Sequence, residues 1–186
     1  FKTTLLAVWL MISSIAFLDY SSSGLENPLS HLLLLVFLYI CLDHSSATGT
    51  RRLFWASLVA GLAALNRLDT ILFYLPLLVY EWSLYKSDRL KASLIVLGGF
   101  LPLLCWGFFS LVYYGFLFPN TFYAKLNTTV SNSVFVLHGL FYVINSLRND
   151  PVTLVIFCSA GLVTFIKGDL PKKLALLGGV LYFLYG

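Results

Sequence analysis

Six polar side chains belong to types that could bind a phosphorylated and hydroxylated ligand: Glu26, Arg67, Asp69, Asn120, Tyr123 and Lys125. A carboxylate such as Glu26 can orient a hydroxyl group or help to organise a metal ion or an acceptor. The planar guanidinium of Arg67 suits phosphate oxygens, and the Lys125 ammonium can neutralise a phosphate. The amide of Asn120 and the phenol of Tyr123 suit hydrogen bonds to polyhydroxylated compounds. These residues are therefore candidate substrate-binding residues.

Each motif also has a purely structural interpretation. The serine-rich stretch before Pro28 could simply start a helix, whose dipole would stabilise Glu26. Arg67 and Asp69 could form an ion pair at a helix end, where an exposed pair contributes little to stability. The third motif could be a loop with interfacial aromatic residues after a long helix that Pro119 ends. The residue types alone leave both interpretations open.

The elements that carry these motifs are apolar runs. Of the 186 residues, 59% are apolar and 11% are charged, and the mean hydropathy is +0.88, whereas roughly a quarter of the residues in soluble domains are charged. All the charges lie between runs at 3–18, 29–42, 53–65, 70–80, 92–118, 134–147, 151–166 and 174–186. This layout excludes an ordinary water-soluble globule and predicts an all-α fold, a polytopic transmembrane helical bundle.

The remaining composition excludes several other classes of site. The net charge is +4, but the basic residues occupy short loops beside apolar runs, so no nucleic-acid partner is expected. The three cysteines lie singly within apolar runs, which indicates no disulfide or zinc site. The three histidines are equally scattered, and no metal site is predicted from them.

The distribution of basic residues predicts the topology. The run 134–147 is amphipathic, with its leucines on one helical face and His138 and Asn145 largely off it. If this run spans the membrane, seven Lys and Arg residues lie inside and five outside. If it stays at the outer surface, nine lie inside and three outside, a stronger positive-inside bias. We therefore expect about seven spans plus one outer-face amphipathic or re-entrant helix.

This topology gathers the three motifs on one face. The outer loops are then 19–28, 66–69 and 119–133, and the inner loops are basic and otherwise featureless. Gly98, Gly99 and Pro102 predict a kink near the start of the long run 92–118. The chain begins and ends within apolar stretches, so we expect residues 1–186 to be a single transmembrane domain from a longer protein.

Three stretches resemble the signatures of bacterial GT-C type integral-membrane glycosyltransferases. They are SSSGLENPL (21–29), LAALNRLDTILFYLPLL (62–78) and YYGFLFPNTFYAKL (113–126), in the order found in arabinofuranosyltransferase-like and other polyprenyl-phosphate-sugar-dependent enzymes. Each motif is weak alone, but their order and spacing extend over residues 20–126, the larger part of the chain. The resemblance implies an enzyme of cell-envelope glycan biosynthesis in the bacterial inner membrane, with its motif loops on the extracytoplasmic face.

The resemblance also implies the substrates and the site. The donor would be a polyprenyl-phosphate sugar, and the acceptor an extracytoplasmic glycan, lipid or protein. Glu26, Arg67, Asp69, Asn120, Tyr123 and Lys125 become candidates for binding these substrates. Such enzymes use a carboxylate in the first large outer loop as general base, which we expect upstream of Phe1, and we do not assign that role to Asp19.

The expected chemistry suits these residue types. An acceptor hydroxyl attacks the anomeric carbon, a base takes its proton, and cations such as Arg67 and Lys125 stabilise the departing lipid phosphate. A divalent cation could share that load, although no cofactor is assigned. Two alternatives are a transporter or flippase for lipid-linked sugars and a non-catalytic membrane subunit. The absence of charges within the runs argues against transport, because transport routes commonly carry ionisable residues.

Overall fold

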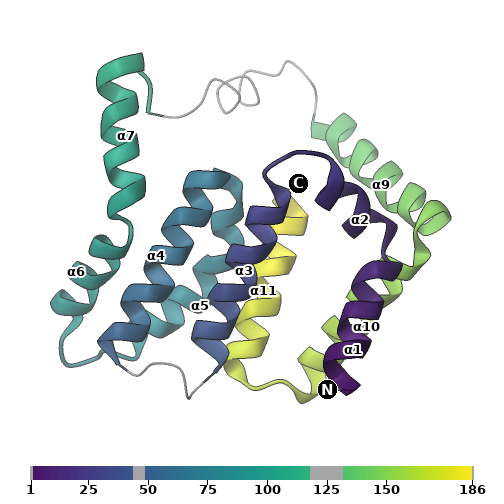
Figure 1. Cartoon of the computed structure of the whole chain (residues 1–186), viewed down its shortest axis with the longest axis horizontal. Helices are drawn as coiled ribbons and strands as arrows, with labels where there is room; N and C mark the ends of the chain where they lie inside the picture. The colour runs from purple at the N-terminus through teal and green to yellow at the C-terminus, as the bar shows by residue number, and fades with distance from the viewer. Residues whose placement is uncertain (1, 44–48, 118–131, 186) are drawn as a thin grey trace.

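The computed structural model describes residues 2–43, 49–117 and 132–185, and this part of the chain is helical with no strand (Figure 1). The elements are α1 (Lys2–Ser13), α2 (Ile15–Ser22), α3 (Asn27–Leu42), α4 (Thr50–Asn66), the 3-10 helix η1 (Leu68–Thr70), α5 (Ile71–Ser83), α6 (Arg89–Gly99), α7 (Leu101–Tyr114), α9 (Asn132–Asn149), α10 (Pro151–Lys167) and α11 (Leu170–Tyr185). The predicted all-α class is confirmed.

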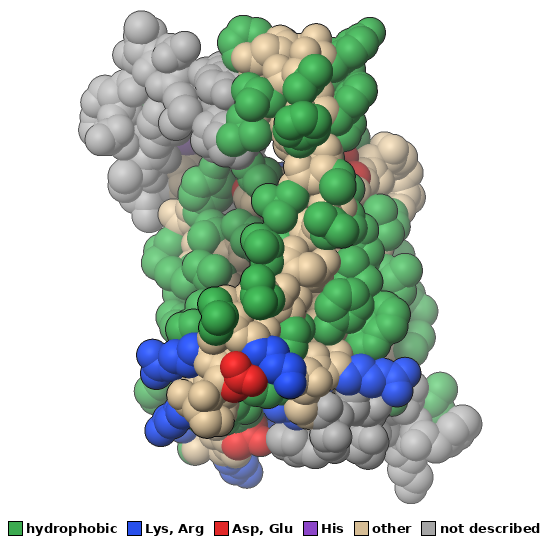
Figure 2. All heavy atoms as spheres, turned by 90° about the vertical axis from the view of Figure 1, so that its left-hand side faces the viewer, with side chains coloured by type: hydrophobic (Ala, Val, Ile, Leu, Met, Phe, Trp, Pro, Cys, Tyr) green, Lys and Arg blue, Asp and Glu red, His purple; other side chains and the backbone are tan. Residues whose placement is uncertain are grey.

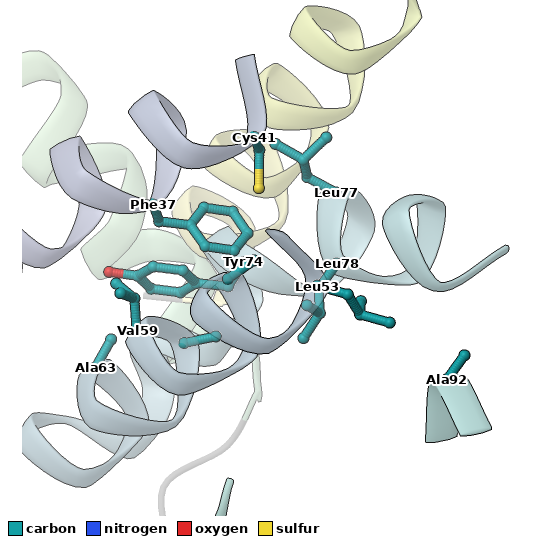
Figure 3. Close-up of a cluster of buried hydrophobic side chains, with 11 residues drawn as sticks. Phe37, Cys41, Leu53, Val59, Ala63, Tyr74, Leu77, Leu78 and Ala92 are labelled. Atoms are coloured by element: carbon teal, nitrogen blue, oxygen red, sulfur yellow. The ribbon is translucent and has the colours of Figure 1, made fainter. Parts of the chain in front are cut away.

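The core lies where α4 packs against α3, α5 and α6, with α11 against α5. Phe37, Leu53, Tyr74 and Leu77 are fully or almost fully buried there, and the rings of Phe37 and Tyr74 meet edge to face with centroids 4.8 Å apart (Figure 3). The buried positions of α4 are otherwise mostly Ala, Ser and Gly. Small side chains let neighbouring helices approach α4 closely, which makes it the central helix.

Two helix breaks follow from local chemistry. The run 92–118 bends by 59° between α6 and α7, after Gly99 and just before Pro102, so the predicted kink is confirmed. The run 3–18, expected as one segment, is divided into α1 and α2. The Ser14 hydroxyl accepts a hydrogen bond from Phe17 N at 3.1 Å and so caps a new helix.

The ends of the helices gather at two ends of the molecule. Figure 1 shows the end of α3, the start of α4 and the links α5–α6 and α10–α11 at one end, and the links α2–α3 and α4–α5 with the end of α7 at the other. For the loops that the structure describes, this grouping agrees with the predicted division. Figure 2 shows Lys and Arg side chains gathered at the first end, below a surface of hydrophobic side chains.

Helix α9 contains the run 134–147. Its apolar stripe faces outward, because Leu137, Phe141, Ile144 and Leu147 each expose more than half of their surface. Figure 1 shows α9 at the edge of the molecule, between the end of α7 and α10. The predicted amphipathic helix is therefore present and does not bury its apolar face in the core.

Among the described residues, no single helix is both long enough and apolar enough to cross a membrane alone. Three helix pairs satisfy both conditions jointly, namely α2 with α3, α6 with α7, and α9 with α10. Each pair is bent at its break, by 115°, 59° and 107° respectively.

Candidate functional site

The first two polar motifs meet at one end of the bundle. The first ends at the start of α3, where Glu26 is the N-cap residue and Pro28 lies in the first turn. The preceding turn passes through Gly24, whose φ of 72° favours glycine. The second motif is the link from α4 to α5, and α3 packs against α4. The packing of these two helices brings together motifs forty residues apart.

Arg67 is the centre of the site. Its Nη2 and Nε donate to the two carboxylate oxygens of Asp69 at 2.9 and 3.2 Å, a bidentate arrangement. Its Nη1 lies 3.5 Å from a carboxylate oxygen of Glu26 and donates to Oδ1 of Asn27 at 3.4 Å. The guanidinium is thus fixed by one strong contact within its own turn and two longer contacts to the start of α3.

Two further side chains hold the turn in place. Asn66 Nδ2 donates to the Glu26 carbonyl oxygen at 3.2 Å and to Ser30 Oγ at 2.9 Å, which ties the end of α4 to α3. The Thr70 hydroxyl donates to the carbonyl oxygens of Ala63 and Arg67, at 3.0 and 2.7 Å. These bonds satisfy main-chain groups at the helix end and limit the freedom of Arg67.

The cluster is partly exposed and carries more negative than positive charge. The side chain of Arg67 is 31% exposed, that of Glu26 41% and that of Asp69 18%. The hydrogen bond with Asp69 raises the pKa of Arg67 above its ordinary value, so the guanidinium stays charged. Two carboxylates and one guanidinium leave the cluster with a formal charge of −1, which an approaching cation or an additional basic group would balance.

A cavity of about 130 Å³ adjoins the guanidinium. It is lined by Asn27, Ser30, His31, Leu34, Arg67, Thr70, Phe73, Tyr74 and Tyr182. The lining comes from α3, the α4–α5 link, α5 and α11. Four of these side chains are apolar or aromatic and five are polar, and in small-molecule sites a few polar groups set the orientation of the ligand.

Of the six candidate residues, Glu26, Arg67 and Asp69 lie together. The predicted topology puts their loops on one face, and the packing of α3 on α4 brings them into contact. Asn120, Tyr123 and Lys125 fall outside the described residues. Among the residues that the structure describes, no group of three or more His, Cys, Asp and Glu side chains could hold a metal ion.

Of the residues that line the cavity, only Arg67 was predicted from the sequence, and Asn27, His31 and Tyr182 are among those that were missed. Asn27 and His31 are four residues apart, so they share one face of α3 just after Glu26, and this spacing is a usable signal. Tyr182 lies inside an apolar run, where no local pattern distinguishes it from a core aromatic residue. Only the packing of α11 against α5 brings it to the cavity.

A second charged site, at the opposite end of α4, corrects the expectation of featureless inner loops. Arg52 donates through Nε to Glu81 Oε2 at 2.9 Å, and its Nη2 lies 2.7 Å from the same oxygen. Glu81 is 3% exposed and Arg52 14%. Both residues belong to helices, α4 and α5, rather than to the loops 43–52 and 81–91, because these helices extend beyond their uncharged runs.

The arrangement around Arg67 places a guanidinium, within a cluster of formal charge −1, beside a cavity of about 130 Å³. No family model, no curated protein and no solved structure matches the chain.

Proposed function

We propose that the protein is an integral-membrane glycosyltransferase of the GT-C type, which transfers a sugar from a polyprenyl-phosphate donor to an extracytoplasmic glycan, lipid or protein. The observation that carries the proposal is the contact between Arg67 and the start of α3 across forty residues. Two of the three stretches that resemble this family thus form one site. The third stretch begins in the last turn of α7, and this end of α7 lies at the same end of the molecule (Figure 1).

In the proposed reaction, this site would bind the lipid phosphate that leaves the sugar. The acceptor oxygen forms a bond to the anomeric carbon as its proton passes to a base, and the bond from that carbon to the phosphate oxygen breaks. The lipid phosphate keeps the bonding electrons and gains negative charge. Arg67, already oriented by Asp69, stabilises that charge, and Lys125 is the second cation proposed for this task. We assign the role of base to no residue of the chain.

Support for a membrane location comes from the surface. Large apolar side chains are widely exposed, and Val155, Phe165 and Ile166 on α10 each expose about two thirds of their area. Soluble monomers rarely expose contiguous apolar surface of this extent. A bacterial inner membrane, with the Arg67 end on the extracytoplasmic side, accounts for this surface and for the basic residues at the other end (Figure 2).

The test is sugar transfer by the full-length protein reconstituted in lipid vesicles. Polyprenyl-phosphate sugars serve as donors, and mass spectrometry scores the transfer for the wild type, Arg67→Ala and Lys125→Ala. The matched control is Arg51→Ala, because Arg51 is an exposed arginine at the opposite end of α4. We expect transfer by the wild type and the control, and weak donor binding by the other two variants.

The rival functions give different outcomes. A flippase would move the lipid-linked sugar across the vesicle membrane without consuming it, and the proposal would then be abandoned. A non-catalytic subunit would neither bind nor consume any donor in a broad panel, and Arg67→Ala would leave its assembly with partner proteins unchanged.

A further inference from the structure

Helix α11 lies outside the three motif stretches but also reaches the Arg67 site. It packs against α5, and Figure 1 shows that it ends at the end of the molecule that holds the α4–α5 link. Its residue Tyr182 lines the same cavity as Arg67. The site therefore includes a side chain to which the family resemblance does not point.

Two residues of α11 fix its position against α5. A Cβ on Gly178 would overlap the main chain of Phe73, so the two backbones are in close contact there. One turn further along α11, the ring of Tyr182 stacks on the ring of Phe73, with centroids 4.2 Å apart and planes inclined by 25°. Two contacts with one residue, a helical turn apart, restrict both the depth and the rotation of α11. The Tyr182 side chain is therefore held in one place.

This packing brings the Tyr182 hydroxyl to the pair formed by Arg67 and Asp69. Asp69 precedes Phe73 by four residues, and α5 and α11 run in opposite directions (Figure 1). The turn of α11 that follows Gly178 therefore faces the residues just before Phe73. The Tyr182 hydroxyl makes a side-chain hydrogen bond with Asp69. The pKa of Arg67 is raised above its ordinary value, first by the hydrogen bond with Asp69 and also by the nearby Tyr182.

The Asp69 carboxylate has room for this additional donor. Its two oxygens accept one hydrogen bond each from Arg67, at 3.2 and 2.9 Å, whereas an ionised carboxylate offers about four acceptor positions. Hydrogen bonds to an ionised acceptor are stronger than those between neutral groups. On its other side, Arg67 has only the longer contacts with Glu26 and Asn27, at 3.5 and 3.4 Å. The orientation of the guanidinium therefore depends chiefly on how firmly Asp69 is held.

We infer that Tyr182 is a positioning residue: its hydroxyl donates a hydrogen bond to the Asp69 carboxylate, which in turn orients the Arg67 guanidinium toward an anionic ligand. The inference rests on the proposed function, in which that anion is the lipid phosphate. It adds that α11 helps to set the orientation of the cation. Tyr182→Phe isolates the hydroxyl, because it keeps the ring that stacks on Phe73.

The test is a double-mutant cycle in the full-length protein, reconstituted in lipid nanodiscs. The variants are Tyr182→Phe, Asp69→Asn and their combination, and the probe is polyprenyl phosphate without sugar. Tyr185→Phe is the matched control, because Tyr185 lies on the same helix and is 56% exposed. Sugar transfer by the wild type from a polyprenyl-phosphate sugar is measured with the same preparation.

We expect Tyr182→Phe to weaken binding of the lipid phosphate roughly fivefold, and Tyr185→Phe to leave it unchanged. In the Asp69→Asn background, Tyr182→Phe should cause no further loss, because the hydroxyl acts through Asp69. An equal loss in both backgrounds would show that the hydroxyl contacts the ligand directly. Unchanged binding in Tyr182→Phe would show that the ring only packs. Either result overturns the inference.

A spectroscopic measurement without ligand examines the guanidinium itself. Arg67 Nε donates to Asp69 Oδ1, so the hydrogen exchange rate of this N–H group reports how well Asp69 holds the guanidinium. NMR of isotope-labelled arginine measures the rate, and Arg67→Lys identifies the signal by removing it. The exchange should become roughly fivefold faster in Tyr182→Phe and stay unchanged in Tyr185→Phe, whereas a role in ring packing alone would leave both rates unchanged.

Failure of the inference and failure of the proposed function give different results. If the wild type transfers sugar while Tyr182→Phe changes neither lipid-phosphate binding nor the exchange rate, the inference is overturned and the proposed function stands. If the wild type neither transfers sugar nor binds the lipid phosphate, the proposed function fails. The exchange rate then decides the inference: faster exchange in Tyr182→Phe alone supports it, and an unchanged rate overturns it.

Discussion

The Asp150 carboxylate accepts a hydrogen bond from the main-chain N–H of Ala16, at 2.9 Å and across 134 residues. The same carboxylate caps α10, because it also accepts from Thr153 N at 3.2 Å and from the Thr153 hydroxyl at 2.6 Å. Ser14, which caps α2, lies 2.6 Å from the Thr153 hydroxyl. One carboxylate therefore serves the positive ends of two helices, α2 and α10.

Asp150→Asn should lower the melting temperature at neutral pH. Hydrogen bonds from Thr153 and Ala16 hold the pKa of Asp150 below its ordinary value, so the carboxylate stabilises the fold above the unfolded-state pKa of about 3.9. This contribution is lost as the pH falls through the lower folded-state pKa. The difference between wild type and variant should shrink below about pH 4, which thermal unfolding in detergent between pH 7 and pH 3 would measure.

Asp88→Asn is the control for this prediction. Asp88 is the N-cap residue of α6 but makes no capping hydrogen bond with its side chain, and it is exposed. Its replacement should leave the melting temperature unchanged. A loss of stability in Asp150→Asn that stays constant across the pH range would show that the charge of Asp150 is unimportant.

Glu81→Leu should destabilise the protein by about 3 kcal/mol, because it leaves the Arg52 guanidinium in a largely buried position without its carboxylate. The double variant Arg52→Met, Glu81→Leu should recover most of that loss, since an apolar pair of similar volume replaces both charges. Denaturant unfolding in detergent micelles measures each free energy. Equal losses in the single and the double variant would contradict this account.

Gly178→Ala should destabilise the packing of α11 on α5 by about 1–3 kcal/mol. A Cβ at this position would overlap the carbonyl oxygen of Phe73, and main-chain atoms cannot move aside cheaply. Gly179→Ala is the matched control, because nothing lies within 4 Å of a Cβ there. The control should be neutral or stabilising by up to about 1 kcal/mol through helix propensity. Equal melting temperatures for the two variants would argue against the close contact.

Asp69→Asn should weaken binding of polyprenyl phosphate roughly tenfold, because Asp69 orients the Arg67 guanidinium through two hydrogen bonds. Glu26→Gln should change the affinity by less than about threefold, since its contact with Arg67 is a single one at 3.5 Å and partly exposed. Titration of each variant in nanodiscs with the lipid phosphate compares them. A larger loss in Glu26→Gln would mean that Glu26 contacts the ligand itself.

Local chemistry allowed several features to be predicted from the sequence. Composition and apolar runs indicated the helical class, and Gly99 with Pro102 indicated the bend of 59°. Pro28 marked the first turn of α3. The pair Arg67 and Asp69 was also predictable, because two residues in one tight turn meet without help from the rest of the fold. Each of these features depends on neighbours in the sequence.

The candidate site was predictable in part. The alternation of helices placed Glu26 and Arg67 at one end of the molecule, but contact between them requires α3 to pack on α4 in one register. The sequence pattern does not determine that register, because Ala, Ser and Gly on α4 permit close approach along much of its length. The involvement of Asn27 and the cavity followed only from the packed structure.

The sequence by itself determined the helical class, the bend after Gly99 and, for the described loops 19–28, 66–69, 81–91 and 167–173, which of them share an end of the molecule (Figure 1), since these depend on apolar runs, Pro and Gly positions and charge. Only the tertiary structure decided the partners of Glu81, Asp150 and Tyr182. Their contacts join segments far apart in the chain, and each depends on the rotation and depth at which one helix packs against another. Those quantities come from the fit of side chains across the interface, which no local pattern contains.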